Sequence, residues 1–250
     1  MSTSPFSLDG KTILITGASS GIGRAAAIEC AKAGASSCII IGRNKDELKK
    51  TNSLISSSCK VEECICDLSD SSAVEEMVKN LPALDGVILN AGMNKMQLLQ
   101  FYSKSDIDGI FSINCFSPML LMKLLVKNRK LKNPSSVVFT ASISGYSNIS
   151  PANGVYGASK SALSAFMKFA ALELAPKGIR CNAIHPGRVE TPLIHKVTDE
   201  DTINADLKKY PMRRYANPTE IAWSFVYLLS EAASWITGSD LVIDGGRSLT

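Results

Sequence analysis

The chain has 250 residues, 45% of them hydrophobic, and a formal net charge of +4 at pH 7. This length and apolar content suit one large α/β domain with a sizeable core, and we expect a single domain over residues 1–250. Acidic residues are interspersed almost throughout, which argues against a nucleic-acid-binding protein. We interpret the densest basic run, residues 127–132, as a solvated helix end.

The cysteine and histidine content indicates which cellular compartment to expect and whether a metal site is plausible. The seven cysteines form no CxxC pair, and their odd number favours free thiols in a reducing compartment over a disulfide framework. Two histidines are too few for a His-rich metal centre, so we expect no metal. No secretory signal and no apolar run of the roughly 20 residues that a membrane span needs is visible. We therefore expect a cytoplasmic protein.

Short apolar runs that end in Gly, Asn or Asp alternate with helix-like stretches along the whole chain. The runs predict buried strands at residues 12–16, 38–41, 62–66, 86–90, 136–142, 179–184 and 240–244. The helix-like stretches cover residues 23–34, 45–55, 72–81, 117–128, 161–175 and 219–230. This alternation predicts a parallel sheet with helices on both faces. The polar segment at about 190–217 is interpreted either as a flap over a site or as a surface insertion.

A glycine-rich turn follows the first predicted strand. Gly17, Gly21 and Gly23 stand where that strand would give way to a helix. Glycines permit a tight turn there and let backbone N–H groups approach a pyrophosphate at the helix N-terminus. Although the spacing GxxxGxG departs from the GxGxxG fingerprint, its place at the first strand-to-helix junction favours nucleotide binding over a purely structural turn.

The end of the second predicted strand discriminates between cofactors. An acidic residue there would accept the ribose 2′-hydroxyl of NAD, whereas this chain has Gly42 followed by Arg43. A guanidinium can pair with a 2′-phosphate. We therefore predict NADP(H), with an ordinary surface arginine as the alternative interpretation of Arg43.

Tyr156 and Lys160 are four positions apart in the segment GVYGASKSALSAF. Residues at i and i+4 share a helix face, and a neighbouring cation lowers the cost of moving a phenolic proton. The pair is consistent with acid/base chemistry. Taken alone, it is more typical of a packed tyrosine beside a solvated lysine.

Further motifs follow the glycine turn in a fixed order. They are Asp67, NAG at 90–92, Asn114, Ser142, YGASK at 156–160, PGRVET at 186–191 and ITGSDLVIDGG near the C-terminus. In order and spacing, the set resembles the short-chain dehydrogenase/reductase family over essentially the whole chain. The resemblance implies a Rossmann-like, doubly wound seven-stranded parallel sheet of strand order 3-2-1-4-5-6-7 and a nicotinamide cofactor.

The resemblance also implies roles for individual residues. Tyr156 would protonate the substrate carbonyl oxygen, Lys160 would stabilise the phenolate and hold the nicotinamide ribose, and Ser142 would polarise the carbonyl. Asn114 would support a water that links Lys160 to solvent. The cofactor would contact Gly17, Ser19, Ser20, Gly21, Ile22, Gly23, Arg43, Asp67, Leu68, Asn90, Ala91, Gly92, Tyr156, Lys160, Pro186, Gly187, Val189 and Thr191.

Several of these residues have a structural alternative. Asn90 could brace the central strands, Ser142 could be a buried hydroxyl bonded to backbone, and Pro186 with Gly187 could only turn the chain. A non-catalytic NADPH-binding module would keep the fold, but it would be expected to lack Tyr156 or Lys160, and both are present.

Within the family, the compact length, the PGRVET segment at 186–191 and the WITGSDLVIDGG ending most resemble bacterial 3-oxoacyl-acyl-carrier-protein reductases. This resemblance implies a β-keto thioester as substrate in fatty acid biosynthesis, and an acidic acyl carrier protein as partner. Lys177 and the region 129–132 would attract that partner at the entrance. The alternative is a sugar, steroid or small ketone reduced by the same mechanism. Most relatives are homotetramers, and the apolar stretch from residue 161 suits either a subunit interface or a helix buried within one subunit.

Overall fold

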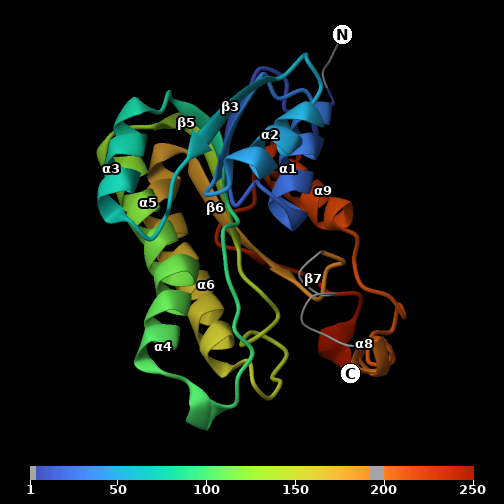
Figure 1. The fold of residues 1–250 in the computed structure, drawn as a ribbon. Coiled ribbons are helices and arrows are strands. Elements are labelled where there is room, and N and C mark those ends of the chain that lie inside the picture. The colour runs from blue at the N-terminus through green and yellow to red at the C-terminus, as the bar shows by residue number, and fades with distance from the viewer. Residues whose placement is uncertain (1–3, 192–199) are drawn as a thin grey trace.

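The computed structural model describes residues 4–191 and 200–250 (Figure 1). Seven parallel strands form one sheet in the order β3-β2-β1-β4-β5-β6-β7. The predicted fold class is therefore confirmed. The strands are β1 Thr12–Thr16, β2 Ser37–Gly42, β3 Lys60–Ile65, β4 Leu84–Leu89, β5 Leu131–Thr140, β6 Ile179–Pro186 and β7 Asp240–Ile243.

Helices cover both faces of this sheet. On one side lie α1, α2 and α9, and on the other lie α3, α4, α5 and α6 (Figure 1). The helices are α1 Gly21–Lys32, α2 Lys45–Ser53, α3 Ser71–Asn80, α4 Lys104–Phe111, α5 Ser117–Lys127, α6 Gly154–Leu174, α8 Glu200–Leu207 and α9 Pro218–Leu229. Of these, α4 and α8 were not predicted from the sequence. Since α8 lies inside the predicted flap and residues 192–199 lie outside the described part of the chain, the flap stays a prediction.

The two faces of β1 show how a continuous apolar strand serves two cores. Leu14 belongs to the hydrophobic cluster beneath α3, α5 and α6, whereas Ile13 and Ile15 belong to the cluster beneath α1 and α9. All three are fully buried. Successive side chains of a strand point to opposite faces, so a strand covered by helices on both sides must be apolar throughout.

Small side chains let α1 lie close to the sheet and to α9. Residues 25–27 are three consecutive alanines, and all are buried. The N-terminus of α9 is closed by a capping box between Asn217 and Glu220, with Pro218 in the first turn. This packing fixes the N-terminus of α1 beside the carboxyl end of β1, where the predicted nucleotide site lies.

The segment Lys104–Lys127 is one continuous helical run of 24 residues, longer than the helix predicted from residue 117. It is long and apolar enough, by length and composition alone, to cross a membrane. Half of its most apolar window is buried within the protein, and the run packs against α3 and α6. This burial is that of a core helix. A π-helical turn, Ser112–Phe116, joins α4 to α5 and carries Asn114.

Candidate active site

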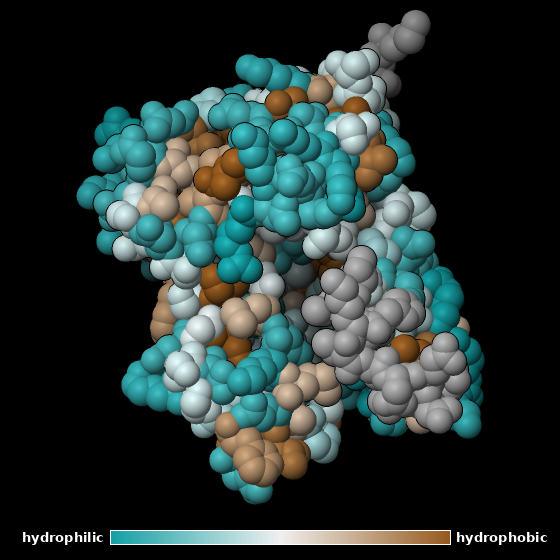
Figure 2. Space-filling model, viewed as in Figure 1, coloured by the Kyte–Doolittle hydropathy of each residue, from teal (hydrophilic) through white to brown (hydrophobic). Residues whose placement is uncertain are grey.

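A cavity of about 530 Å³ lies at the carboxyl ends of the central strands, where Figure 2 shows a hollow near the middle of the face. In open parallel sheets ligands bind at this edge. The predicted residues that line it are Gly17, Ser19, Ser20, Gly21, Ile22, Arg43, Asp67, Leu68, Asn90, Ala91, Gly92, Ser142, Tyr156, Lys160, Pro186, Gly187, Val189 and Thr191. Gly23 and Asn114 do not line the cavity.

The cavity wall also includes residues that the sequence reasoning did not select. They are Ile41, Gly42, Cys66, Met93, Asn94, Ile113, Thr140 and Ala141. All but Ile113 lie at or just beyond the carboxyl end of a strand. Their position directly beside selected motif residues was the signal that could have found them.

The turn from β1 into α1 leaves no room for a side chain at Gly17 or at Gly23. Gly17 has a φ of 68°, and a Cβ on it would lie 2.9 Å from the Cα of Ala91. A Cβ on Gly23 would lie 2.2 Å from the carbonyl oxygen of Gly17. Gly23 therefore serves the close packing of the turn from behind the cavity wall, and both positions require glycine.

The N-terminus of α1 opens into the cavity. Ser20, its N-cap, makes no side-chain capping bond, so the first N–H groups of α1 receive no acceptor from that side chain. Gly21 and Ile22 line the cavity at this point. An uncapped helix N-terminus at a glycine turn suits a phosphate or pyrophosphate group, and these residues fit a dinucleotide.

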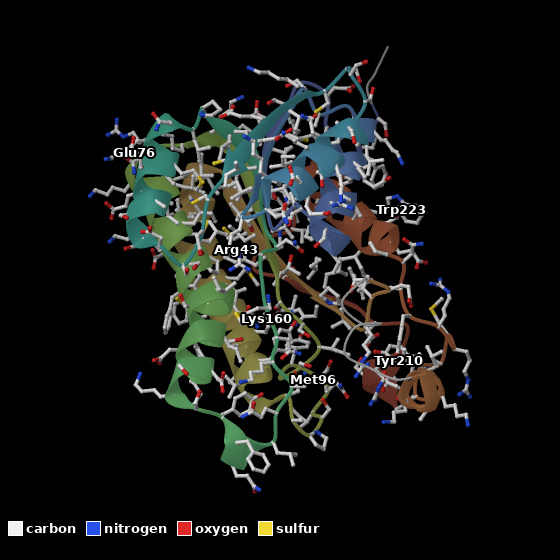
Figure 3. All side chains as sticks on the ribbon, in the orientation of Figure 1. Arg43, Glu76, Met96, Lys160, Tyr210 and Trp223 are labelled. Atoms are coloured by element: carbon white, nitrogen blue, oxygen red, sulfur yellow. The ribbon has the colours of Figure 1, made fainter. Side chains whose placement is uncertain are left out.

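One end of the cavity carries Arg43, immediately after β2 (Figure 3). Its side chain is exposed, and within the described residues its guanidinium makes no hydrogen bond or ion pair. Asp67 faces the same end: its hydrogen bonds from Ser69 lower its pKa first, and the charge of Arg43 lowers it further. Arg43 is thus a free cation at the place predicted for a 2′-phosphate.

Asn90 has the bracing role that the sequence left open. Its amide nitrogen donates to the carbonyl oxygen of Thr16 at 3.2 Å. The backbone N–H groups of Asn90 and Ala91 donate to the Thr16 hydroxyl at 2.9 and 3.0 Å. These bonds tie the ends of β1 and β4 together and fix the middle of the cavity wall.

The other end of the cavity holds Ser142 and Tyr156. Burial raises the pKa of the Tyr156 phenol, and its hydrogen bond with Ser142 opposes that rise without cancelling it. The Ser142 hydroxyl also accepts the N–H of Ser144 at 3.1 Å. The Ser142 hydroxyl is therefore bonded to backbone, as the alternative interpretation of this residue expected. The same hydroxyl also makes the hydrogen bond with Tyr156.

Lys160 lies one helical turn further along α6, at the centre of the view in Figure 3. It is 3% exposed, and its ammonium donates to the carbonyl oxygen of Thr140 at 2.7 Å. Desolvation lowers its pKa to about 8. We expected this cation to ease ionisation of Tyr156, but burial raises the pKa of the phenol, and the contact that opposes this rise is the hydrogen bond with Ser142.

The side-chain amide of Asn114 is hydrogen-bonded through both its oxygen and its nitrogen. Its oxygen accepts the Met93 N–H at 2.8 Å, and its nitrogen donates to the Met93 carbonyl and to the Ser159 hydroxyl at 2.9 and 3.0 Å. It thereby joins the segment after β4 to α6. Both amide hydrogens are used, so the predicted water would bind the second lone pair of the Asn114 amide oxygen or its main chain.

The basic residues predicted at the entrance lie elsewhere. Region 129–132 leads into the start of β5, and Lys177 precedes β6, so both lie at the amino edge of the sheet. There Lys130 donates to the carbonyl of Lys79, and Lys132 pairs with Asp85 at 2.7 Å. The 21 residues of α6, about 30 Å of helix, separate this edge from the Tyr156 end. The expectation that these residues border this chain's own entrance was wrong.

Among residues 4–191 and 200–250, no group of three or more His, Cys, Asp or Glu side chains could hold a metal ion. All seven cysteines are free, and six of them are buried.

The comparisons with known proteins cover almost the entire chain. Residues 17–248 match the family described as enoyl-(acyl carrier protein) reductase. The 3-oxoacyl-[acyl-carrier-protein] reductase FabG of Rickettsia bellii is 33% identical over 239 residues, covering 96% of this chain and 97% of that protein.

Two solved structures show the same similarity in three dimensions. A protein assigned as a 2-deoxy-D-gluconate 3-dehydrogenase from Agrobacterium tumefaciens, with bound NADP, is 28% identical with a TM-score of 0.90 over 98% of this chain and 99% of its own. Levodione reductase is also 28% identical, with a TM-score of 0.91 over 97% and 99%.

The sheet order, the glycine turn and the Ser142, Tyr156 and Lys160 cluster agree with these matches. The chain therefore belongs to the short-chain dehydrogenase/reductase family, whose members are oxidoreductases acting on CH–OH and C=O groups.

Proposed function

We propose that this protein is an NADPH-dependent carbonyl reductase whose substrate is a 3-oxoacyl thioester. The observation that carries the proposal is the layout of one continuous cavity. A free guanidinium, Arg43, lies at one end, and the buried Ser142, the half-buried Tyr156 and the buried Lys160 lie at the other. This layout can anchor a phosphorylated dinucleotide along its length and present a proton donor at its far end.

Each catalytic side chain has one task in this proposal. Ser142 donates its hydroxyl hydrogen to the carbonyl oxygen of the substrate and holds it beside Tyr156. Tyr156, whose raised pKa keeps its phenol protonated at neutral pH, donates the proton that completes the alcohol. Lys160 stabilises the phenolate that remains. When bound, the reduced nicotinamide supplies the hydride.

Preference for the phosphorylated cofactor rests on Arg43. The guanidinium lines the cavity where β2 ends and is free to form charge-assisted hydrogen bonds with a 2′-phosphate. Together with the hydrogen bonds from Ser69, the charge of Arg43 lowers the pKa of Asp67, so this charge acts across this end of the cavity. A related structure contains NADP, which supports the same choice of cofactor here.

The segment after β4 lines the cavity at Met93 and Asn94 and continues into four exposed apolar residues, which we take as an apolar rim that favours a substrate with an apolar chain. Met96, Leu98, Leu99 and Phe101 are 54%, 52%, 85% and 61% exposed, and Figure 3 shows Met96 below Lys160. The segment that carries them is held in place: the N–H of Gln97 donates to the Ala152 carbonyl at 2.8 Å. A fixed apolar rim suits the alkyl part of an acyl thioester better than a sugar, and the reductase relatives point to the same class.

A different ketone or alcohol is the second candidate. The structural relatives include a protein assigned as a sugar-acid dehydrogenase and levodione reductase, which reach similar TM-scores with different substrates. The same catalytic cluster would serve all of these substrates, so the rim decides between them.

We also propose that the protein is a homotetramer that takes its substrate from an acyl carrier protein. On α6, Phe169 and Leu172 are 66% and 76% exposed, whereas nine other residues of this helix are buried. An apolar pair on the outer face of the catalytic helix suits contact with a second copy. The carrier rests on the relatives alone, and light scattering of the purified chain tests the subunit number.

The direct test is the initial rate of cofactor oxidation with a short 3-oxoacyl thioester, using NADPH and NADH at equal concentrations. We expect rapid turnover with NADPH and little with NADH. Turnover of a sugar or small cyclic ketone in place of the thioester would move the substrate to the second candidate. Cofactor binding without turnover of any carbonyl would contradict the catalytic proposal.

A further inference from the structure

His185, near the end of β6, is fully buried beside the loop that carries Ser142. Its Nδ1 lies 2.8 Å from the carbonyl oxygen of Ser142, and its Nε2 lies 2.7 Å from a carboxylate oxygen of Asp240 on β7. The ring of Tyr146, from the same loop as Ser142, covers the imidazole with the ring centroids 4.1 Å apart. Neither His185 nor Asp240 has a role in the proposed reaction.

Asp240 is bonded on both of its oxygens. Its side chain is 6% exposed, and it accepts the Ser164 hydroxyl at 2.7 Å on the oxygen that faces His185. The ammonium of Lys168, from α6, lies 2.8 Å from the other oxygen. Burial raises the pKa of this carboxyl, but the hydrogen bonds from Lys168, Ser164 and His185 outweigh burial and hold it below its usual range. The carboxylate is therefore ionised at neutral pH.

The partners of His185 fix how many hydrogens its ring carries. An ionised carboxylate can only accept hydrogen bonds, and so can a peptide carbonyl. Both ring nitrogens face such acceptors at hydrogen-bond distance. Neutral imidazole has only one N–H, and would leave one of the two acceptors facing a bare nitrogen lone pair. Only the doubly protonated imidazolium would donate to both acceptors.

The Ser142 carbonyl is the point at which this charge acts on the loop. The N–H groups on either side, of Ala141 and Ile143, donate to the carbonyls of Ile184 and Pro186 on β6 at 2.9 and 3.2 Å. Between them, the Ser142 carbonyl is held by a side chain, His185. A rotation of this peptide would turn the whole Ser142 residue, and its hydroxyl would lose its aim at Tyr156 and the substrate.

We propose that His185 is a positioning residue, held as an imidazolium by Asp240, which fixes the Ser142 backbone so that the Ser142 hydroxyl points at the substrate carbonyl. The catalytic consequence rests on the proposed function, whereas the protonation state of His185 does not. The charged and titratable groups around the imidazole are Asp240 from β7, Lys168 from α6 through that carboxylate, and Tyr146 from the loop after β5.

The protonation state can be measured directly because the chain contains only two histidines. The variant His195→Gln, produced without a histidine tag, leaves His185 as its one imidazole. Long-range ¹H–¹⁵N spectra of the labelled full-length variant at pH 8 should show two protonated ring nitrogens, at a pH where an imidazole with the ordinary pKa of about 6.5 is neutral. A bare ring nitrogen at pH 8 would overturn the proposal. This experiment needs no substrate, so it stands even if the reaction class is different.

The positioning role is tested with Asp240→Asn, which keeps the shape and an acceptor oxygen but removes the charge. With NADPH and a short 3-oxoacyl thioester at pH 8, we expect kcat to fall about tenfold while NADPH affinity stays within twofold. Lowering the pH to 6 should return part of the lost kcat, relative to wild type at each pH, because the imidazole regains its second proton. A wild-type kcat at pH 8, or a loss that pH 6 does not relieve, would contradict this role.

Asp85→Asn is the matched control at the opposite edge of the sheet. Asp85 is a largely buried carboxylate, 19% exposed, paired with Lys132 and accepting the Thr12 N–H. It should lose stability in a similar way but keep kcat within twofold at both pH values. Equal losses of kcat in both variants would mean that general destabilisation lowers kcat in Asp240→Asn, and would contradict the positioning role of His185.

Discussion

The two ends of the cavity use charge in opposite ways. At the β2 end, Arg43 is exposed and makes no bond within the described residues. At the α6 end, Tyr156 and Lys160 are enclosed, and burial shifts the pKa of both. A free guanidinium in water binds an anion without changing its own ionisation, whereas a buried acid or base has its proton affinity adjusted by its surroundings. The first end is suited to recognition and the second to chemistry.

The largest expected effect is at the chemical end. Tyr156→Phe removes the proposed proton donor but retains the ring, so turnover should fall by about 10²- to 10⁴-fold. NADPH affinity, measured by fluorescence titration, should change little because the recognition end is intact. Near-normal turnover would break the division between the two ends.

Tyr227→Phe is the control for that variant. Tyr227 lies on α9, outside the residues that line the cavity, and the substitution removes the same phenolic oxygen. We expect wild-type turnover. A loss comparable to that of Tyr156→Phe would mean that the assay reports general damage to the fold.

The next largest effect is expected at the recognition end. Arg43→Ala removes one charge-assisted contact, worth about 1.5 to 3 kcal/mol, so the dissociation constant of NADPH should rise about tenfold to a hundredfold. NADH affinity should stay within about twofold, as should kcat at saturating cofactor. Lys45→Ala, an exposed cation two residues away, should leave both affinities unchanged. Unaltered preference in Arg43→Ala would mean that another residue reads the phosphate.

The smallest effect is a pH dependence that belongs to the chemical end alone. Desolvation lowers the pKa of Lys160 to about 8, so in the free enzyme this cation is present below pH 8 and is lost as the pH rises through that value. The value of kcat/KM for NADPH, which reports ionisations of the free enzyme, should therefore fall several-fold between pH 7 and 9. Lys160→Arg should be slower and lack this decline. A flat wild-type profile would contradict the role of desolvation.

Much of this layout could be predicted because parallel strands and their turns are encoded locally. Apolar runs marked all seven strands, and the glycines marked a turn where a Cβ would collide with backbone. The order of motifs along the chain then placed Ser142, Tyr156 and Lys160 together, since the carboxyl ends of parallel strands share one edge.

The remaining features depend on three-dimensional neighbours that no local pattern reveals. The pKa of Tyr156 rises because of burial, which cannot be seen from its spacing to Lys160. Lys177 was assigned to the entrance by resemblance, and only the direction of α6 shows that it lies at the other edge. The contacts of His185 come from two segments far from it in sequence, the loop after β5 and the strand β7, so its environment became visible only in the folded chain.

The π-helical turn at Ser112–Phe116 makes the middle of the chain sensitive to length. Such a turn holds one residue more than a regular α-helical turn, so removing a single residue there could restore a regular helix. Because the wide turn absorbs the extra residue, α4 and α5 would keep their relative rotation, and the change would fall on the turn itself. Asn114, which the turn carries, would then swing away from Met93 and Ser159. The extra residue reconciles a packed helix with a correctly aimed amide.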